Sequence, residues 1–112
     1  MEVIEEDKIA PVIIDLGAPK RGEMNENWVG MFGGAVKLIL KKLFEGQSIP
    51  ATIKGTPSEI RSFAEALNRE KDYLEKYNEY GLDNPQTYKS KYKLEQAVNT
   101  FERKTGIVWP FK

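Results

Sequence analysis

The clearest structural boundary in the sequence is the stretch Thr56-Pro57-Ser58-Glu59. Its threonine hydroxyl suits a helix N-cap, its proline suits the first helical position, and its glutamate completes a capping box three residues after the cap. Apolar residues then recur at helical spacing along one side of the chain, namely Ile60, Phe63, Ala64, Leu67 and Leu74. The pattern predicts a helix from Pro57 to about Tyr80, roughly 36 Å long at 1.5 Å per residue.

A second boundary lies at Gly81-Leu82-Asp83-Asn84-Pro85. The glycine suits the end of one helix, and the proline suits the first turn of the next. The segment that follows predicts another helix, ending near Lys104, with an apolar stripe formed by Leu94, Ala97, Val98 and Phe101. Together the two helices predict a long antiparallel helical hairpin near residues 57–104.

The residues before the hairpin predict two short strands and one amphipathic helix. Val12–Ile14 and Ile49–Lys54 are short segments, apolar or alternating, next to turn-forming residues, which is typical of strands. Between them, apolar residues recur at helical spacing from Met24 to Phe44 and predict a helix near residues 26–45. Glycine costs a helix up to about 1 kcal/mol relative to alanine, so we expect a break or bend at Gly30, Gly33 and Gly34.

The sequence begins with an acidic segment and ends with an apolar one. Residues 1–8 hold four carboxylates and one lysine, so we expect a flexible acidic arm. Ile107–Phe111 predicts a third short strand or a docked tail. The expected fold class is α+β, with one domain over residues 9–112 that combines a small sheet of short strands, the amphipathic helix and the hairpin. A mainly α bundle is the alternative.

The composition excludes several classes of chemistry, because the 112 residues include no histidine and no cysteine. Imidazole acid–base and metal chemistry, thiolate nucleophiles and cysteine metal sites are therefore excluded. The sequence contains no phosphate-binding loop, no dinucleotide-binding glycine motif and no calcium loop. We expect a protein that is not an enzyme, that uses no cofactor or metal, and that has no small-molecule substrate.

All five tyrosines lie between residues 73 and 92, at the far end of the predicted hairpin, and four of them point away from its apolar stripes. Lysines alternate with them, and this mixture is typical of contacts with proteins and nucleic acids. The predicted partner-binding residues are Tyr73, Tyr80, Tyr88, Lys89, Lys91, Tyr92 and Lys93. In the alternative interpretation, Tyr77, Tyr80, Leu82 and Tyr88 form a local cluster that packs the hairpin turn.

The predicted helix near residues 26–45 has a broad apolar surface, and short strands leave edges that must be covered or shared. We therefore expect self-association or incorporation into a larger assembly, through Trp28, Met31, Phe32, Trp109 and Phe111. Lys37, Lys41 and Lys42 exclude a transmembrane segment here. An amphipathic helix on a membrane surface is the less favoured alternative.

Three stretches resemble small uncharacterised proteins of tailed bacteriophages: Gly55–Glu59, Gly81–Pro85 and Thr105–Lys112. The resemblance covers roughly the second half of the chain and brings no functional residue with it. It implies a phage-encoded virion or accessory protein made in the bacterial cytoplasm. The acidic first residues lack the basic region of a secretory signal, so we expect a location in the host cytoplasm or the virion.

The leading hypothesis is a non-enzymatic structural or protein-interaction component, such as a small phage virion or accessory protein, that assembles with itself or with larger partners. The first alternative is a nucleic-acid-associated module acting through Tyr88, Lys89, Lys91, Tyr92 and Lys93. Because 17 basic residues balance 17 acidic ones, such binding would be weak and sensitive to salt. The second alternative is an inhibitor of a host protein, in which the acidic arm imitates phosphate.

Overall fold

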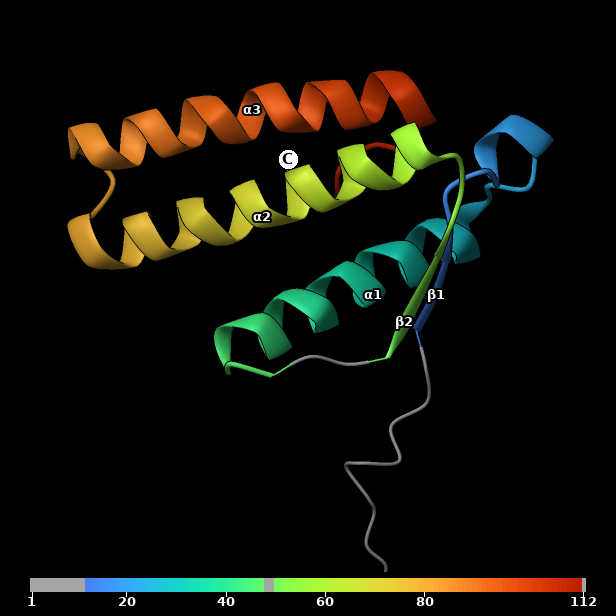
Figure 1. Ribbon diagram of the computed structural model, residues 1–112, viewed down its shortest axis with the longest axis horizontal. Coiled ribbons are helices and arrows are strands. Elements are labelled where there is room, and N and C mark those ends of the chain that lie inside the picture. Colours follow the sequence, from blue (N-terminus) through green and yellow to red (C-terminus); the bar gives the residue numbers. More distant parts are fainter. Residues whose placement is uncertain (1–11, 48–49, 112) are drawn as a thin grey trace, which may run out of the picture.

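The computed structural model describes residues 12–47 and 50–111. In chain order the elements are β1 (Val12–Asp15), the short 3₁₀ helix η2 (Pro19–Arg21), α1 (Glu26–Phe44), β2 (Ala51–Lys54), α2 (Pro57–Tyr80) and α3 (Pro85–Thr105). Figure 1 shows the predicted α+β arrangement, in which a long helical hairpin lies beside a strand pair and one further helix. The predicted acidic arm at residues 1–8 lies outside the described residues.

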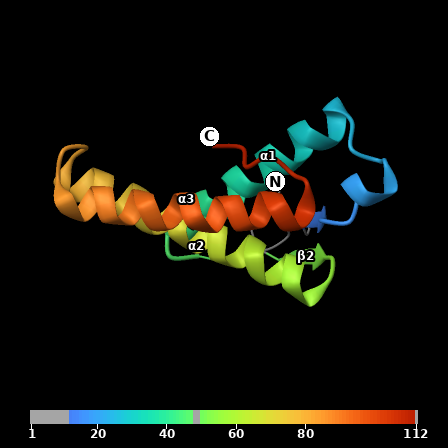
Figure 2. The same cartoon turned by 90° about the horizontal axis from the view of Figure 1, so that it is seen from above.

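The helical hairpin is confirmed, with α2 and α3 lying antiparallel along most of their length (Figure 2). At the start of α2, the Glu59 N–H donates to Thr56 Oγ1 at 3.1 Å and the Thr56 N–H donates to Glu59 Oε1 at 2.9 Å. At the turn, the side chain of Asn84 accepts from the Gln86 N–H at 2.8 Å and begins α3. Side-chain caps therefore satisfy backbone N–H groups at both helix starts.

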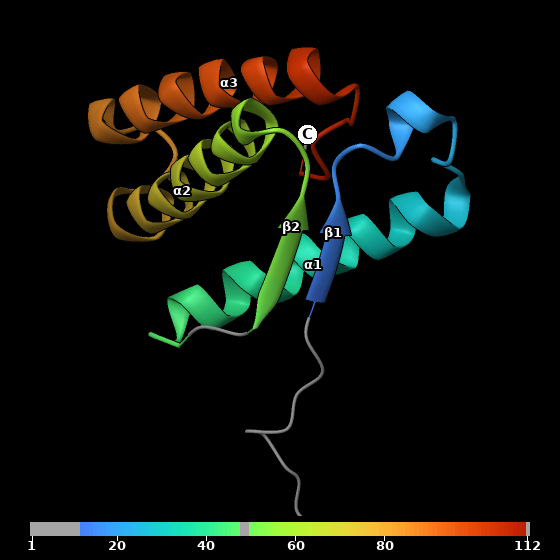
Figure 3. The same ribbon diagram turned by 45° about the vertical axis from the view of Figure 1, so that its right-hand side comes forward.

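Strands β1 and β2 pair in parallel, with Val12 opposite Ala51 and Ile14 opposite Ile53. The sequence left the strand order open. Helix α1 connects the two strands as a crossover and passes across one face of the pair (Figure 3). Ile14 is buried in the core, whereas Ile13 is 63% exposed, as expected for side chains that alternate between the two faces of a strand.

The core is built around aromatic rings contributed by different segments: Phe32 from α1, Phe63 from α2, Phe101 from α3 and Trp109 from the residues after α3. Ring centroids lie 6.1 Å apart for Phe32 and Phe101, and 5.4 Å apart for Phe101 and Trp109. Such offset and edge-on pairs stabilise a core beyond the area that they bury. The core thus holds α1 against the hairpin.

The predicted third strand at Ile107–Phe111 is wrong, and the alternative of a docked tail is correct. Ile107 and Trp109 insert into the core instead of pairing with a strand. The Trp109 N–H donates to Glu102 Oε2 at 2.8 Å, so a side chain takes the place of a sheet partner. The burial of the large indole ring favours the docked position over an edge position in the sheet.

The predicted break in α1 does not occur, because the helix runs without interruption from Glu26 to Phe44. Its buried face carries Phe32, Val36 and Leu40, which pack into the core across the glycine-containing turns. This packing outweighs the cost of glycine in a helix. Within residues 12–47 and 50–111, no helix has the length and apolarity needed to cross a membrane.

Candidate functional site

A cavity of about 460 Å³ lies where the C-terminal tail meets the helical hairpin. Its polar and aromatic lining comes from three segments: Glu70 and Tyr73 of α2, Lys91, Glu95 and Asn99 of α3, and Trp109 and Phe111 of the tail. The cavity thus brings together two of the predicted partner-binding residues, Tyr73 and Lys91. A concave site with apolar walls and a few polar groups is the usual form of a ligand pocket.

The carboxylate of Glu70 is the most unusual group in this cavity, because the residue is only 5% exposed. Its Oε1 accepts a hydrogen bond from Trp109 Nε1 at 2.8 Å. Within the described part of the chain, this indole is the only polar partner of the Glu70 side chain. Burial raises the pKa of the Glu70 carboxyl above its ordinary value, and the bond from the indole opposes the rise only in part.

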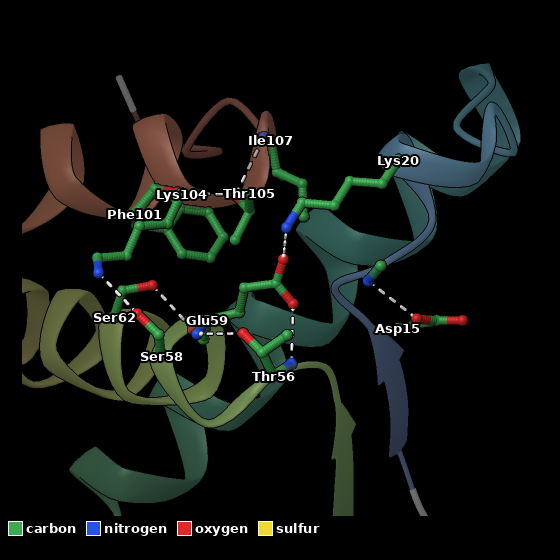
Figure 4. Close-up of polar contacts among 11 residues, drawn as sticks. Asp15, Lys20, Thr56, Ser58, Glu59, Ser62, Phe101, Lys104, Thr105 and Ile107 are labelled. Carbon is green, nitrogen blue, oxygen red and sulfur yellow. Dashed lines mark hydrogen bonds and ion pairs between the residues drawn. The ribbon is translucent and has the colours of Figure 1, made fainter.

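Glu59 is also buried on α2 but has a different environment (Figure 4). Lys20, from η2, forms an ion pair with Glu59 Oε2, while Oε1 accepts from the Thr56 N–H. The bond from Lys20, followed by that from the Thr56 N–H, lowers the pKa of the Glu59 carboxyl. Both oxygens of Glu59 therefore have partners, and its role in the fold is to cap α2 and fix η2.

Tyr88 and Tyr92 continue the cavity-bearing face of α3 towards the hairpin turn. The two residues are four apart in α3. Glu95 and Asn99, which line the cavity, follow Tyr92 by three and seven residues and so lie on the same side of the helix. Tyr88 is 56% exposed and Tyr92 is 63% exposed. The Tyr88 hydroxyl donates to Asp83 at 3.3 Å. One side of α3 therefore presents two tyrosines next to the cavity.

The other tyrosines divide between surface and core. Tyr77 and Tyr80 are exposed, as is Leu82 in the turn. These side chains therefore do not form the buried cluster that the alternative interpretation expected at the turn. Tyr73 is half-buried, packs against the core and stacks on Tyr77 with ring centroids 6.4 Å apart. Of the two tyrosines on which the recognition surface most depends, Tyr92 is exposed to solvent whereas Tyr73 is half-buried against the core.

The predicted lysines do not form one basic stripe. Lys91 lines the cavity with Glu70, whereas Lys93 lines a different groove, of about 280 Å³, with Glu65 and Arg69. Because residues two apart point about 200° away from each other around a helix, Lys89 shares the side of Lys93 and not that of Lys91. A phosphate backbone that contacts one side of α3 therefore does not meet all three lysines.

The residues predicted at an assembly interface differ in exposure. Phe32 and Trp109 are buried by the aromatic packing of the core, which removes them from the expected surface. Trp28 is half-buried and stacks on Phe32 with ring centroids 5.3 Å apart. Met31 is 71% exposed, and Phe111 is exposed at the mouth of the cavity.

A groove of about 270 Å³ lies between β1 and α1, with Ile13, Trp28 and Met31 in its lining. The Val12 N–H donates to the Pro50 carbonyl at 2.9 Å, and the Leu16 N–H donates to the Lys54 carbonyl at 2.8 Å. Since alternate residues of a parallel strand bond to the same neighbour, the backbone groups of Ile13 point away from β2. β1 therefore has an open outer edge among the described residues.

Sequence reasoning missed Glu70, although a signal for it exists. Glu70 follows Phe63 by seven residues and Ala66 by four, so its position falls on the buried side of α2. A carboxylate at such a position requires a partner, and the partner is the Trp109 indole, 39 residues away in the sequence. That pairing depends on the docked tail and has no local sequence pattern.

No group of three or more metal-ligating side chains that could hold a metal ion occurs among the residues that the structure describes. No protein-family model, curated protein or solved structure matches the chain. The functional assignment therefore depends on the surfaces described above.

Proposed function

We propose that this protein is a non-enzymatic structural or protein-interaction component that assembles with itself along the outer edge of β1. In the same proposal, the tyrosine-bearing side of α3 contacts a second protein. The phage virion or accessory role implied by the sequence resemblance is the proposed setting for both contacts.

The open edge of β1 is the observation that carries this proposal. Parallel strands are normally buried on both faces and belong to sheets of several strands. Here a parallel pair exposes Ile13 on one face, and a groove lies beside its edge. An added strand would satisfy the free backbone groups and cover the apolar lining of the groove.

A second copy of the chain is the occupant that we propose for this edge. Two-fold symmetric pairing of β1 with the β1 strand of another copy is the simplest closed arrangement. Each chain would then bring one copy of Ile13 and one of Met31 to the same interface. Because both side chains are more than half exposed, the pairing would remove apolar surface from water on both chains.

A protein is the favoured partner for Tyr88 and Tyr92. Tyrosine is enriched at protein interfaces because its ring buries a large area and its hydroxyl keeps a polar contact. The lysines of this segment lie on different sides of α3, and the chain has no net charge, so few phosphates could be neutralised together. These observations favour protein contact over the nucleic-acid alternative.

Sedimentation velocity over micromolar to submillimolar concentrations tests the self-association. We expect a reversible dimer whose association constant falls at least tenfold, about 1.4 kcal/mol, in Ile13→Lys and in Met31→Lys. Val29→Lys is the matched control, because Val29 is also exposed on α1 but points about 200° away from Met31. The dimer should survive or strengthen at high salt, since apolar burial drives it.

A monomer throughout this concentration range would contradict the proposal. So would a dimer that Val29→Lys weakens as much as Met31→Lys does, because the interface would then lie elsewhere on α1.

A further inference from the structure

Aromatic rings and a buried carboxylate enclose the cavity between the hairpin and the tail. Tyr73, Trp109 and Phe111 line it together with Glu70. The Trp109 and Phe111 rings meet edge to face, with centroids 6.2 Å apart. Aromatic faces carry negative charge density and attract cations, most strongly where water is excluded. This combination of side chains is therefore suited to a positively charged group.

The comparison between Glu70 and Glu59 points in the same direction. Both glutamates are buried on α2, but Glu59 has the ammonium group of Lys20 on one oxygen and a backbone donor on the other. Within residues 12–47 and 50–111, Glu70 has one neutral donor, the Trp109 indole, on Oε1. A buried carboxylate is stable in its charged form only when a cation or several donors compensate it.

The rest of the lining favours an organic cation over a bare metal ion. Leu94 and Val98 supply apolar walls along α3 that suit an alkyl stem. The charged side chains in the lining are Glu70, Glu95 and Lys91, so negative charge is in excess when Glu70 is ionised. An alkylammonium group combines the apolar stem and the positive end that these walls accommodate.

We propose that this cavity binds an alkylammonium cation, with its charged end against Glu70 and the surrounding aromatic rings and its stem against Leu94 and Val98. A lysine side chain of a partner protein and a free small amine share this chemistry. The site is independent of the proposed self-association, because it is built from α2, α3 and the tail, whereas the open edge belongs to β1 and α1.

Binding should depend on pH through Glu70. The cation requires the ionised carboxylate, and burial raises the pKa of that carboxyl. At any pH below that raised pKa, a proton must leave Glu70 when the cation binds. The affinity for the cation should fall by about tenfold per pH unit once the pH is below the pKa that Glu70 has in the protein without a bound cation. The other titratable groups lining the cavity are Tyr73 of α2 and Lys91 and Glu95 of α3.

Isothermal titration calorimetry of the full chain with butylammonium chloride tests this proposal. We expect saturable binding of one cation per chain. The affinity for butylammonium should fall at least tenfold in Glu70→Gln, and the wild-type chain should bind uncharged butanol at least tenfold more weakly than butylammonium. The side-chain amide oxygen introduced by Glu70→Gln still accepts from the indole, so the fold and the melting temperature at neutral pH should be preserved. Glu65→Gln is the matched control, because it removes a carboxylate from the exposed side of α2, where Glu65 pairs with Arg69.

The capped lysine derivative N-acetyl-lysine methylamide distinguishes the two sources of the cation. If the capped lysine binds at least as tightly as butylammonium, the natural ligand is a lysine side chain. If the capped lysine does not bind, the natural ligand is a free amine.

Equal binding to wild type and Glu70→Gln, or no saturable binding of butylammonium, would overturn the proposal and leave Glu70 as an anchor for the tail. Failure of cation binding can be distinguished from failure of the proposed self-association. Ile13→Lys should leave cation binding unchanged, and Glu70→Gln should leave the sedimentation behaviour unchanged.

Discussion

At the scale of single residues, partners far away in the sequence decide what a buried glutamate does. The capping role of Glu59 is visible in the sequence, because its partner Thr56 is three residues away. Its ion pair with Lys20 and the bond between Glu70 and Trp109 each span 39 residues, and no local pattern indicates either one. The sequence therefore predicted the helix cap but not the most unusual group in the cavity.

Gly55 illustrates how closely the chain approaches itself at the start of α2. A Cβ atom at Gly55 would lie 2.9 Å from Glu59 Oε1 and 3.2 Å from the Cβ of Leu16, which is fully buried. We predict that Gly55→Ala lowers the free energy of unfolding by about 2 kcal/mol, because either the cap or the core must shift. Urea denaturation measures the change.

Gly34→Ala is the control for this substitution. Gly34 is exposed in α1, and no atom outside the neighbouring backbone of the helix lies within 4 Å of a Cβ added there. The substitution should raise the free energy of unfolding by up to about 1 kcal/mol, as expected for an unstrained helix position. If Gly55→Ala is as stable as wild type, the space between Gly55, Glu59 and Leu16 accommodates a methyl group, and the prediction is wrong.

At the scale of elements, local patterns predicted the helices well and the strands less well. The capping box determines where α2 begins, and the Gly81–Pro85 turn determines where α2 ends and α3 begins, so these predicted bounds agree with the structure. Pairing of β1 with β2 in parallel depends on the α1 crossover, which no short stretch encodes. The third strand was wrong because burial of Ile107 and Trp109 outweighs strand pairing.

The tail is predicted to be an essential part of the core. Trp109→Ala should lower the free energy of unfolding by about 3 to 5 kcal/mol, because it leaves a large void and removes the donor to Glu70. Val108→Ala, at an exposed neighbouring position, should change it by less than about 0.5 kcal/mol. Urea denaturation followed by circular dichroism provides the measurement. Similar, small effects of both substitutions would mean that the tail does not contribute to the core.

At the scale of the whole molecule, the two proposed contact surfaces belong to different parts of the fold. Figure 3 shows β1 on the side of the strand pair that faces away from α2, whereas the cavity and the exposed tyrosines belong to the hairpin and the tail. Composition predicted that aromatic and apolar side chains would be available for contact. It could not separate Met31, which is exposed, from Phe32, which is buried one position later. That distinction arises only when α1 docks on the hairpin.

Hydrogen exchange at the Ile13 amide, followed as protein concentration rises, tests the open edge of β1 most directly. The amide of Leu16 serves as an internal reference, because it donates to Lys54 within the chain. We predict that exchange at Ile13 slows with concentration as a second copy accepts its N–H, while exchange at Leu16 stays slow throughout. Exchange at Ile13 that is equally fast at every concentration, with Leu16 still protected, would contradict self-association through this edge.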